Sequence, residues 1–241
     1  MASALGLTRI PRLSTIAIPR PSTTEPDGSD PIPDLHMRSS ALVIWLFVLS
    51  AAVGLAQGDR GRVQLRDLNG RPMTPFTPIS RASAVFFVAT DCPVSNSYAP
   101  EIQRVCRDYG PRGVECSLVY EDVDTHPSAA HLDQLVRTHL QEYGYAGFTA
   151  IVDRDRTAAA HVKASITPQV FVIDRSGEIR YRGRIDNLYA ALGKTRQQVT
   201  SHDLRDALNA VLAGGSVPHP ETEALGCFIT DPALLRKHDH E

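Results

Sequence analysis

An apolar run that ends near a cysteine is the feature that most constrains how this chain can fold. Residues 84–89 are all apolar, Thr90 and Asp91 follow, and Cys92 then opens a segment with helical periodicity. A short, uninterrupted apolar run is typical of a strand buried on both faces. A helix N-terminus presents unpaired N–H groups and a partial positive charge, and both favour the nucleophilic thiolate over the thiol. The sequence therefore predicts a reactive cysteine at a strand-to-helix junction.

Residues 1–36 are not expected to fold. Prolines interrupt every helix that this segment could form, at Pro11, Pro19, Pro21, Pro26, Pro31 and Pro33. Arg9, Arg12 and Arg20 precede the first acidic residue, which is a pattern found in organellar transit peptides. We favour a different interpretation, in which this disordered extension is upstream sequence that precedes the true start methionine. The reason is that a second N-terminal signal follows it.

Residues 37–56 have the pattern of a secretory signal peptide. Met37 and the single charge of Arg38 precede a short apolar core, and Gly54 and Ala56 form the small-residue pattern of a cleavage site. The alternative is a short membrane anchor with weak attachment, although an apolar run of about 16 residues is short for a helix that spans a bilayer. Both interpretations predict an exported protein, periplasmic or secreted, in a compartment where disulfides form and persist.

The rest of the chain has the size of one domain, which we place at 57–215, followed by an extended tail at 216–241. Strand and helix periodicities alternate along it. The expected strands are 63–68, 84–89, 114–120, 148–152, 169–174 and 178–185, and the expected helices are 93–109, 155–163 and two that Ser128 and Ser201 cap. This order predicts an α/β fold with a mainly parallel central sheet, helices on both faces and an antiparallel C-terminal hairpin. The net charge of −2 indicates no nucleic-acid partner.

Three stretches, 87–95, 165–174 and 174–186, resemble the thioredoxin-like superfamily, and within it the exported redoxins of the AhpC/TSA type. The resemblance runs from about residue 63 to 212 and implies a thioredoxin-like fold. It also implies an antioxidant or thiol-dependent oxidoreductase, which needs no cofactor and uses a protein disulfide or a peroxide as substrate and a thiol as electron donor. In this family the proline that matches Pro168 is cis and lies against the reactive cysteine. The resemblance thus implies that Thr167 and Pro168 bind the substrate.

The chain departs from the family at several positions near Cys92. Ser95 stands where a dithiol oxidoreductase has its second cysteine, and a hydroxyl cannot attack a mixed disulfide. Asn96 likewise replaces the second cysteine of copper-delivering relatives, and Ala89 stands where peroxidases carry Thr or Ser. We therefore expect Ser95 or Thr90 to act at most as a hydrogen-bond donor to the Cys92 sulfur. The carboxylate of Asp91 would oppose thiolate formation.

The other three cysteines are expected to have different roles. Cys106 lies about 21 Å along the predicted helix from Cys92, whereas a disulfide needs Cα atoms within about 7 Å. Cys106 and Cys116 lie on apolar faces, so we expect them to pack in the core, with a structural disulfide between them as the alternative. Cys227 lies in the proline-containing tail. We predict that it is the resolving thiol for Cys92, the alternative being a free or intermolecular thiol.

A non-enzymatic module is the competing functional hypothesis. Such a protein would bind copper through Cys92 and a histidine, since thiolate and imidazole are suitable copper ligands, or it would bind partners on a fold without redox activity. No spacing of histidines forms a specific metal signature, so no metal site is predicted. We favour the enzyme, with Cys92, Cys227, Ser95 and Thr90 as catalytic residues.

Overall fold

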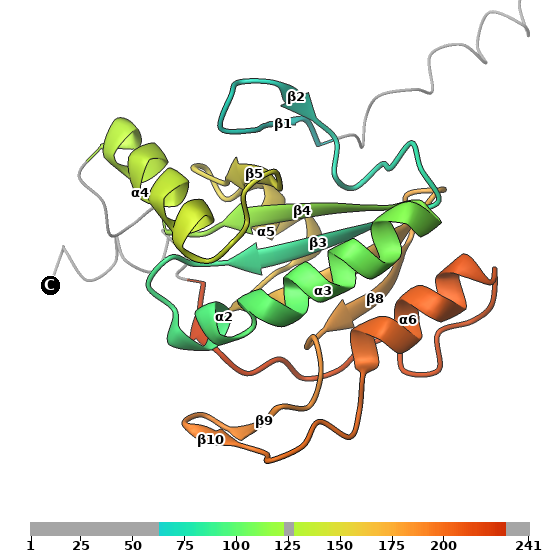
Figure 1. Cartoon of the computed structure of the whole chain (residues 1–241). Coiled ribbons are helices and arrows are strands. Elements are labelled where there is room, and N and C mark those ends of the chain that lie inside the picture. The colour runs from blue at the N-terminus through green and yellow to red at the C-terminus, as the bar shows by residue number, and fades with distance from the viewer. Residues whose placement is uncertain (1–62, 123–127, 230–241) are drawn as a thin grey trace, which may run out of the picture. The chain divides into compact units, whose positions relative to one another are not determined.

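A five-stranded sheet with the strand order β5-β4-β3-β7-β8 forms the centre of the domain (Figure 1). It is seen in a computed structural model of the protein, which describes residues 63–122 and 128–229. The strands are β3 (Ala82–Val88), β4 (Val114–Tyr120), β5 (Thr149–Val152), β7 (Gln169–Asp174) and β8 (Ile179–Gly183). β3, β4 and β5 are parallel, whereas β7 runs antiparallel to both β3 and β8. The predicted α/β, thioredoxin-like fold is confirmed.

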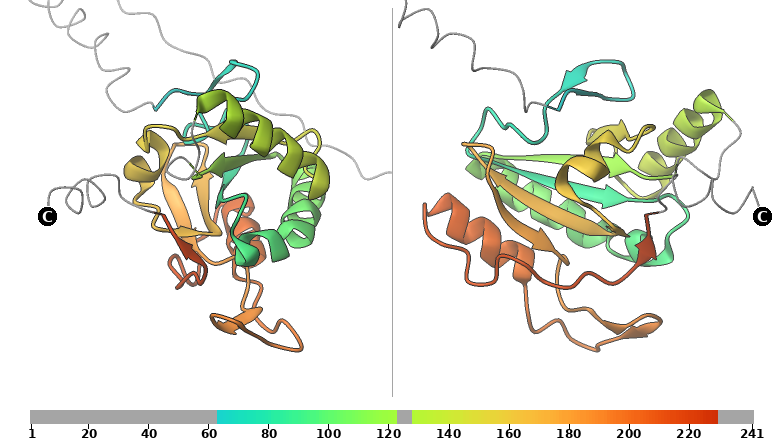
Figure 2. Two further views of the ribbon diagram at one scale, coloured as in Figure 1. Left: turned by 90° about the vertical axis from the view of Figure 1, so that its left-hand side faces the viewer. Right: turned by 180° about the vertical axis from the view of Figure 1, so that it is seen from behind.

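Helices cover both faces of the sheet (Figure 2). They are α2 (Pro93–Ser97), α3 (Ala99–Tyr109), α4 (Ala129–Glu142), α5 (Thr157–Val162) and α6 (Asp203–Leu212), with a short 3-10 helix, η2 (Gly110–Arg112). Buried residues of α3, α4 and α6 form one core cluster with the sheet. Those of α5 form a second cluster, which also includes Leu65 of β1 (Leu65–Arg66), the strand that pairs with β2 (Pro72–Met73).

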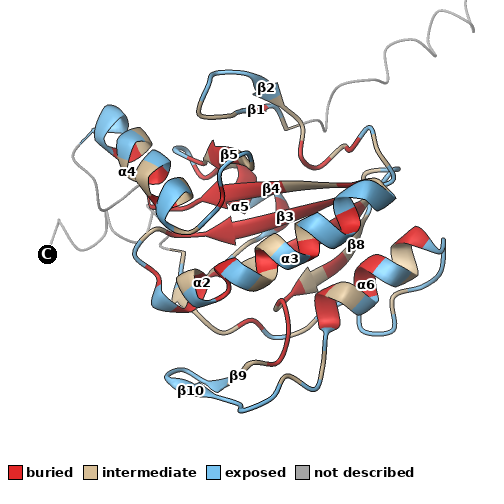
Figure 3. Cartoon of the chain, viewed as in Figure 1, coloured by how far each residue is buried: buried red, intermediate tan, exposed pale blue. Residues whose placement is uncertain are grey.

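The central strand β3 is buried along its entire length (Figure 3). Its side chains alternate between the two core clusters, so that Phe86 and Val88 belong to one and Val85 and Phe87 to the other. Full burial of one such side chain stabilises the fold by about 1.5–3 kcal/mol. β3 is therefore a rigid support for the loop that follows it and carries Cys92.

Two helix predictions need correction. The single helix expected after Cys92 is broken at Tyr98 into α2 and α3. Pro100 lies in the first turn of α3, where its missing N–H costs nothing, but it cannot continue a helix that started at Pro93. Ser201 is not the cap of the last helix, because that position is His202; the Ser201 hydroxyl donates to Asp203 Oδ1 instead. The predicted cap of α4 is confirmed, since Ser128 Oγ accepts from His131 N–H.

Short strands that the sequence did not predict lie outside the central sheet. β9 (Tyr189–Ala191) and β10 (Lys194–Thr195) form a small hairpin after β8. β6 (Ile166–Thr167) pairs with β11 (Cys227–Phe228), which belongs to the predicted extended tail. The described part of the tail thus returns from α6, and its strand β11 lies beside α2 (Figures 1 and 2).

The predicted extension at 1–36 and the predicted signal peptide at 37–56 lie outside the described residues. Within 63–122 and 128–229, no helix is long and apolar enough to cross a membrane.

Cys106 and Cys116 are not free thiols packed in the core, which corrects the favoured interpretation. They form a disulfide with 6.0 Å between their Cα atoms, as the alternative proposed. The bond joins α3 to β4 across only 10 residues of sequence. β4 places Cys116 at the edge of the core, and the last turns of α3 place Cys106 next to it. The short distance between the two sulfurs, rather than their apolar surroundings, therefore decides that they are oxidised.

Replacing both Cys106 and Cys116 by alanine is expected to lower the free energy of unfolding by about 2–3 kcal/mol, because a short cross-linked loop is released in the unfolded chain. Redox activity at Cys92 is expected to remain unchanged. Urea unfolding of the oxidised double variant and of the wild-type chain measures the first effect. Equal midpoints would show that this disulfide contributes nothing to stability.

Candidate functional site

Cys92 occupies the cap position of α2, directly after the loop that leaves β3. Its φ and ψ of −84° and 109° are non-helical, and its sulfur accepts a hydrogen bond from the N–H of Ser95 at 3.4 Å. Pro93 follows at the first helical position, where a fixed φ suits the helix start. The side chain of Cys92 is therefore held at a helix N-terminus by local geometry. One N–H group facing the sulfur would stabilise a thiolate there.

Cys227 of the tail is bonded to Cys92. The disulfide has 6.0 Å between the two Cα atoms and joins residues that are 135 positions apart. Cys92 is completely buried, whereas Cys227 is partly exposed. The structure thus brings the predicted nucleophile and the predicted resolving thiol together. The two sulfurs differ in how easily a partner can reach them.

Thr167 and Pro168 lie against this disulfide, and the peptide bond between them is cis, as expected. The carbonyl oxygen of Thr167 is 3.1 Å from the Cys92 sulfur. Thr167 also lies opposite Cys227 in the antiparallel pairing of β6 with β11. A reduced Cys92 could donate its S–H to this oxygen, whereas the disulfide has no proton to give. The backbone predicted to bind a substrate is therefore paired with the chain's own tail.

The two hydroxyl residues predicted to act on the sulfur have different surroundings. The backbone N–H of Thr90 donates to Asp122 Oδ1 at 2.7 Å, and its hydroxyl donates to the same oxygen at 2.8 Å. Thr90 thus directs its hydroxyl to Asp122 in this oxidised state. The observed hydrogen bond from Ser95 to the sulfur comes from its backbone.

A buried histidine, His139, also supports the loop that carries Cys92. The Asn96 amide donates to the Thr90 carbonyl at 2.9 Å, which leaves Asn96 Oδ1 to accept from His139 Nε2, also at 2.9 Å. His139 Nδ1 then accepts from the Tyr120 hydroxyl at 3.0 Å. His139 lies on α4, stacks on Tyr143 and is buried, and burial lowers its pKa to about 4.

Asp122, Asn96 and His139 therefore hold the loop that carries Cys92, although none was predicted as a site residue. Asp122 follows the end of β4, where a polar residue after a parallel strand is a usable signal. The sequence also carries a signal for His139. Its position on the inner face of the helix capped by Ser128, three residues after Val136, was the signal that could have placed it in the core.

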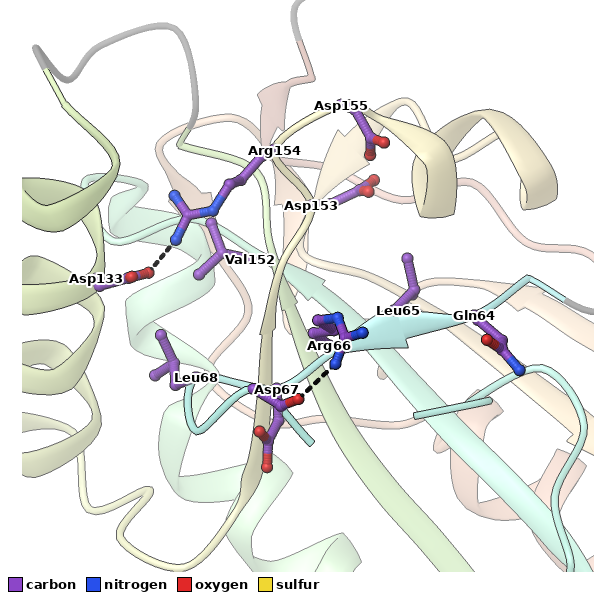
Figure 4. Close-up of a pocket in the computed structure, with 11 residues that line it drawn as sticks. Gln64, Leu65, Arg66, Asp67, Leu68, Asp133, Val152, Asp153, Arg154 and Asp155 are labelled. Atoms are coloured by element: carbon purple, nitrogen blue, oxygen red, sulfur yellow. Dashed lines mark hydrogen bonds and ion pairs between the residues drawn. The ribbon is translucent and has the colours of Figure 1, made fainter. Parts of the chain in front are cut away.

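A pocket of about 460 Å³ is lined by residues of β1, α4 and β5 and by the segments that follow the two strands (Figure 4). Its lining includes several charged side chains, but Arg154 is paired with Asp133, and the Asp153 carboxylate accepts from the N–H groups of Ala158 and Ala159. None of the predicted site residues lines it. In the described part of the chain, no three His, Cys, Asp or Glu side chains gather closely enough to hold a metal ion.

Known proteins resemble this chain in sequence and in fold. The model of the AhpC/TSA family matches residues 52–182. A hypothetical protein from Sinorhizobium meliloti 1021 is 28% identical, with a TM-score of 0.57 over 70% of this chain and 90% of that protein. An uncharacterized conserved protein from Geobacillus kaustophilus is 25% identical, with a TM-score of 0.60 over 71% and 89% of the two chains. No curated protein matches the sequence.

Proposed function

The chain belongs to the AhpC/TSA family of thioredoxin-like redox proteins, and on that premise we propose that it is an exported thiol oxidoreductase whose redox pair is Cys92 and Cys227. One observation carries the proposal: a tail cysteine is bonded to the cysteine at the cap of α2. The tail thiol supplies what Ser95 cannot, because release of a partner from Cys92 needs a second sulfur.

Reduction of the pair would begin at Cys227. In the disulfide Cys92 is completely buried and Cys227 is partly exposed, so an incoming thiolate reaches the Cys227 sulfur first. The S–S bond breaks and the electron pair goes to Cys92, whose thiolate the Ser95 N–H would stabilise as leaving group. A second donor thiol then attacks the mixed disulfide. Overall, two donor thiols become one disulfide, and Cys92 and Cys227 become thiols.

Oxidation would restore the pair by one of two routes. Cys92 thiolate can attack a substrate disulfide, after which Cys227 displaces the bound substrate thiol and closes the disulfide. With a peroxide, Cys92 takes one oxygen to become a sulfenic acid and the alcohol or water leaves; Cys227 then condenses with it and releases water. Asp122 and His139 would act as positioning residues in both routes, because they hold the Thr90–Asn96 loop.

Export is part of this proposal. It rests on the signal-peptide pattern at 37–56 and on the two disulfides, which persist in an oxidising compartment rather than in a reducing one. Copper binding, the competing hypothesis, would need Cys92 as a free thiolate beside a histidine. In the structure, the Cys92 sulfur is bonded to Cys227 instead.

The function is tested by assaying the full chain for insulin disulfide reduction with a thiol donor and for peroxide consumption. Cys92→Ser is expected to abolish whichever activity is present, because both routes start at that sulfur. The double variant at Cys106 and Cys116 is the matched cysteine control and is expected to retain it. Absence of any Cys92-dependent activity, together with tight Cu(I) binding that Cys92→Ser removes, would favour the metal-binding module.

A further inference from the structure

The tail forms a strand on the edge of β6, beside the disulfide. Cys227 lies opposite Thr167, and Phe228 lies opposite Ile166. The N–H of Ile229 donates to the carbonyl oxygen of Ser165 at 2.9 Å, which continues the same register by one residue. The tail therefore lies beside Cys92 as a bound extended polypeptide would. Its backbone pairs with β6, and its cysteine places a sulfur next to Cys92.

Gly226 packs directly on the backbone of β6. A Cβ atom at this position would overlap the carbonyl oxygen of Thr167, lie 2.7 Å from its carbonyl carbon and lie 3.1 Å from Cδ of Pro168. The carbonyl atoms belong to the backbone that holds the register, so they cannot move aside as the end of a flexible side chain can. The register that brings a sulfur to Cys92 thus requires a glycine immediately before the cysteine.

The tail is also held upstream of this contact. The N–H of Arg182 donates to the Pro220 carbonyl at 2.9 Å, and the N–H of Thr222 donates to the Arg182 carbonyl at 3.1 Å. The Thr222 hydroxyl accepts from the Arg184 N–H at 3.1 Å. Beyond Thr222, Ala224 is buried, Leu225, Gly226 and Cys227 are half-buried, and Phe228 is 81% exposed. Opening the disulfide would leave the upstream contacts in place and release only the part that lies on β6.

Residues of the same segment form part of the wall of a small pocket next to Pro168. It has a volume of about 110 Å³, and Glu223 and Leu225 of the tail line it together with Tyr98 and Asp186. The pocket is therefore shared between the tail and the body of the domain, with Leu225 half-buried and Glu223 exposed.

We propose that this edge of β6 binds an extended polypeptide whose reactive cysteine directly follows a glycine, and that the tail is a resident copy that such a substrate displaces. The inference rests on the proposed function, since it requires Cys92 to exchange disulfides with a partner. The Cys92 thiolate attacks the sulfur of the substrate cysteine, and the second thiolate of the substrate leaves. Cys227 then attacks the Cys92 sulfur, the substrate cysteine leaves as a thiolate, and the Cys92–Cys227 disulfide returns. Substrate and tail occupy the same edge in turn.

The glycine requirement is tested on the reduced full chain carrying Cys227→Ser. The probe is the peptide Glu-Ala-Leu-Gly-Cys-Phe-Ile, the sequence of residues 223–229, with its cysteine joined to 2-nitro-5-thiobenzoate. Attack by Cys92 on the peptide sulfur releases the coloured thiolate. The matched peptide has alanine in place of glycine. We expect the glycine peptide to react at least about tenfold faster, because the alanine peptide meets the clash described above. Equal rates would overturn the inference.

Mercaptoethanol joined to the same leaving group separates the two proposals, because it needs no strand edge. If it reacts with Cys92 and the two peptides do not differ, the thiol chemistry stands and the polypeptide site is wrong. If neither it nor the peptides react with Cys92, the proposed function fails.

Occupancy by the tail is tested by adding Gly226→Ala to the Cys227→Ser chain. This variant is expected to react at least about threefold faster with the glycine peptide, because its tail cannot stay on β6. Gly215→Ala is the control, since a Cβ there meets only the Ala210 carbonyl, at 3.6 Å. It should match the parent. If Gly226→Ala also matches the parent, the tail does not compete, and that part of the proposal is overturned.

Discussion

Replacing Cys227 by serine is expected to reduce steady-state turnover by at least about 100-fold, while Cys92 still reacts once with its substrate. The contacts of the tail with β8 keep Cys227 close to Cys92, at an effective concentration on the order of millimolar, whereas an external thiol donor at micromolar concentration must replace it in the variant. Serine replaces the sulfur with a smaller hydroxyl oxygen, which cannot form a disulfide. The variant should therefore accumulate a covalent adduct on Cys92.

Mass spectrometry of the variant after one addition of substrate, followed by non-reducing digestion, locates that adduct. The wild-type chain under the same conditions should show the Cys92–Cys227 disulfide and no adduct. The matched control is Cys106→Ser with Cys116→Ser, which removes two other sulfurs and is expected to keep turnover. Unchanged turnover in Cys227→Ser, with no trapped species, would exclude the resolving role of the tail.

Removing the His139 side chain is expected to cost on the order of 3 kcal/mol of folding free energy, because a His139→Ala chain would leave a buried Tyr120 hydroxyl and the Asn96 carbonyl oxygen without their partner and would open a cavity. The loss should also loosen the Thr90–Asn96 loop and slow the reaction of Cys92. Urea unfolding measures the first effect, and the rate of Cys92 alkylation in the reduced chain measures the second.

Two conservative variants separate a positioning role from simple packing. His139→Gln keeps a donor near the position of Nε2 and can still reach Asn96, whereas His139→Asn is short and keeps only a group near Nδ1, next to Tyr120. If His139 positions the loop, Gln should restore the Cys92 rate better than Asn at similar stability. Equal rates in the two variants would indicate a packing role alone.

The same histidine predicts a pH dependence. Its pKa is about 4 in the folded chain and about 6.5 when unfolded, so between these values the unfolded state binds more protons. Its stabilising contribution is complete above about pH 6.5 and is lost as the pH falls toward 4. Burial and the nearby Asp153 carboxylate raise the pKa of Glu121 to about 9, an effect of opposite sign. Groups such as Glu121 are present in both wild type and His139→Gln, so their contributions cancel in the difference between the two unfolding free energies. This difference should shrink as the pH falls.

Local patterns in the sequence were sufficient for the elements that bury a periodic face. β3 is a continuous apolar run, and α4 has both an apolar face and a serine cap, so each element can be predicted from its own residues. The break at Tyr98 was missed because the apolar spacing continues across it, while the proline that ends the helix lies two residues further on.

Contacts between distant segments were harder to predict. β11 is two residues long, and its partner β6 lies about sixty positions earlier, so no period marks the pairing. The roles of Asn96 and His139 likewise depend on α4 folding against the loop after β3. Cys106 and Cys116 are close in sequence, but only the packing of α3 on β4 shows that they meet. The Cys92–Cys227 pair could be suggested from the absence of any other resolving thiol, whereas the strand that delivers Cys227 could not.

The 135-residue separation of the redox pair makes the oxidation state a property of the whole polypeptide. When the bond is closed, the chain from α2 to β11 is a covalent ring. The ring restricts the unfolded ensemble, and the lost chain entropy corresponds to up to about 5 kcal/mol. Because the two equilibria are linked, the factor by which oxidation raises the folding equilibrium constant is also the factor by which folding favours formation of the disulfide. A donor that reduces the pair in the folded chain must therefore overcome this coupling free energy in addition to the free energy of the bond itself. A local Cys-x-x-Cys pair closes a loop of only a few residues and would carry less than half of this coupling.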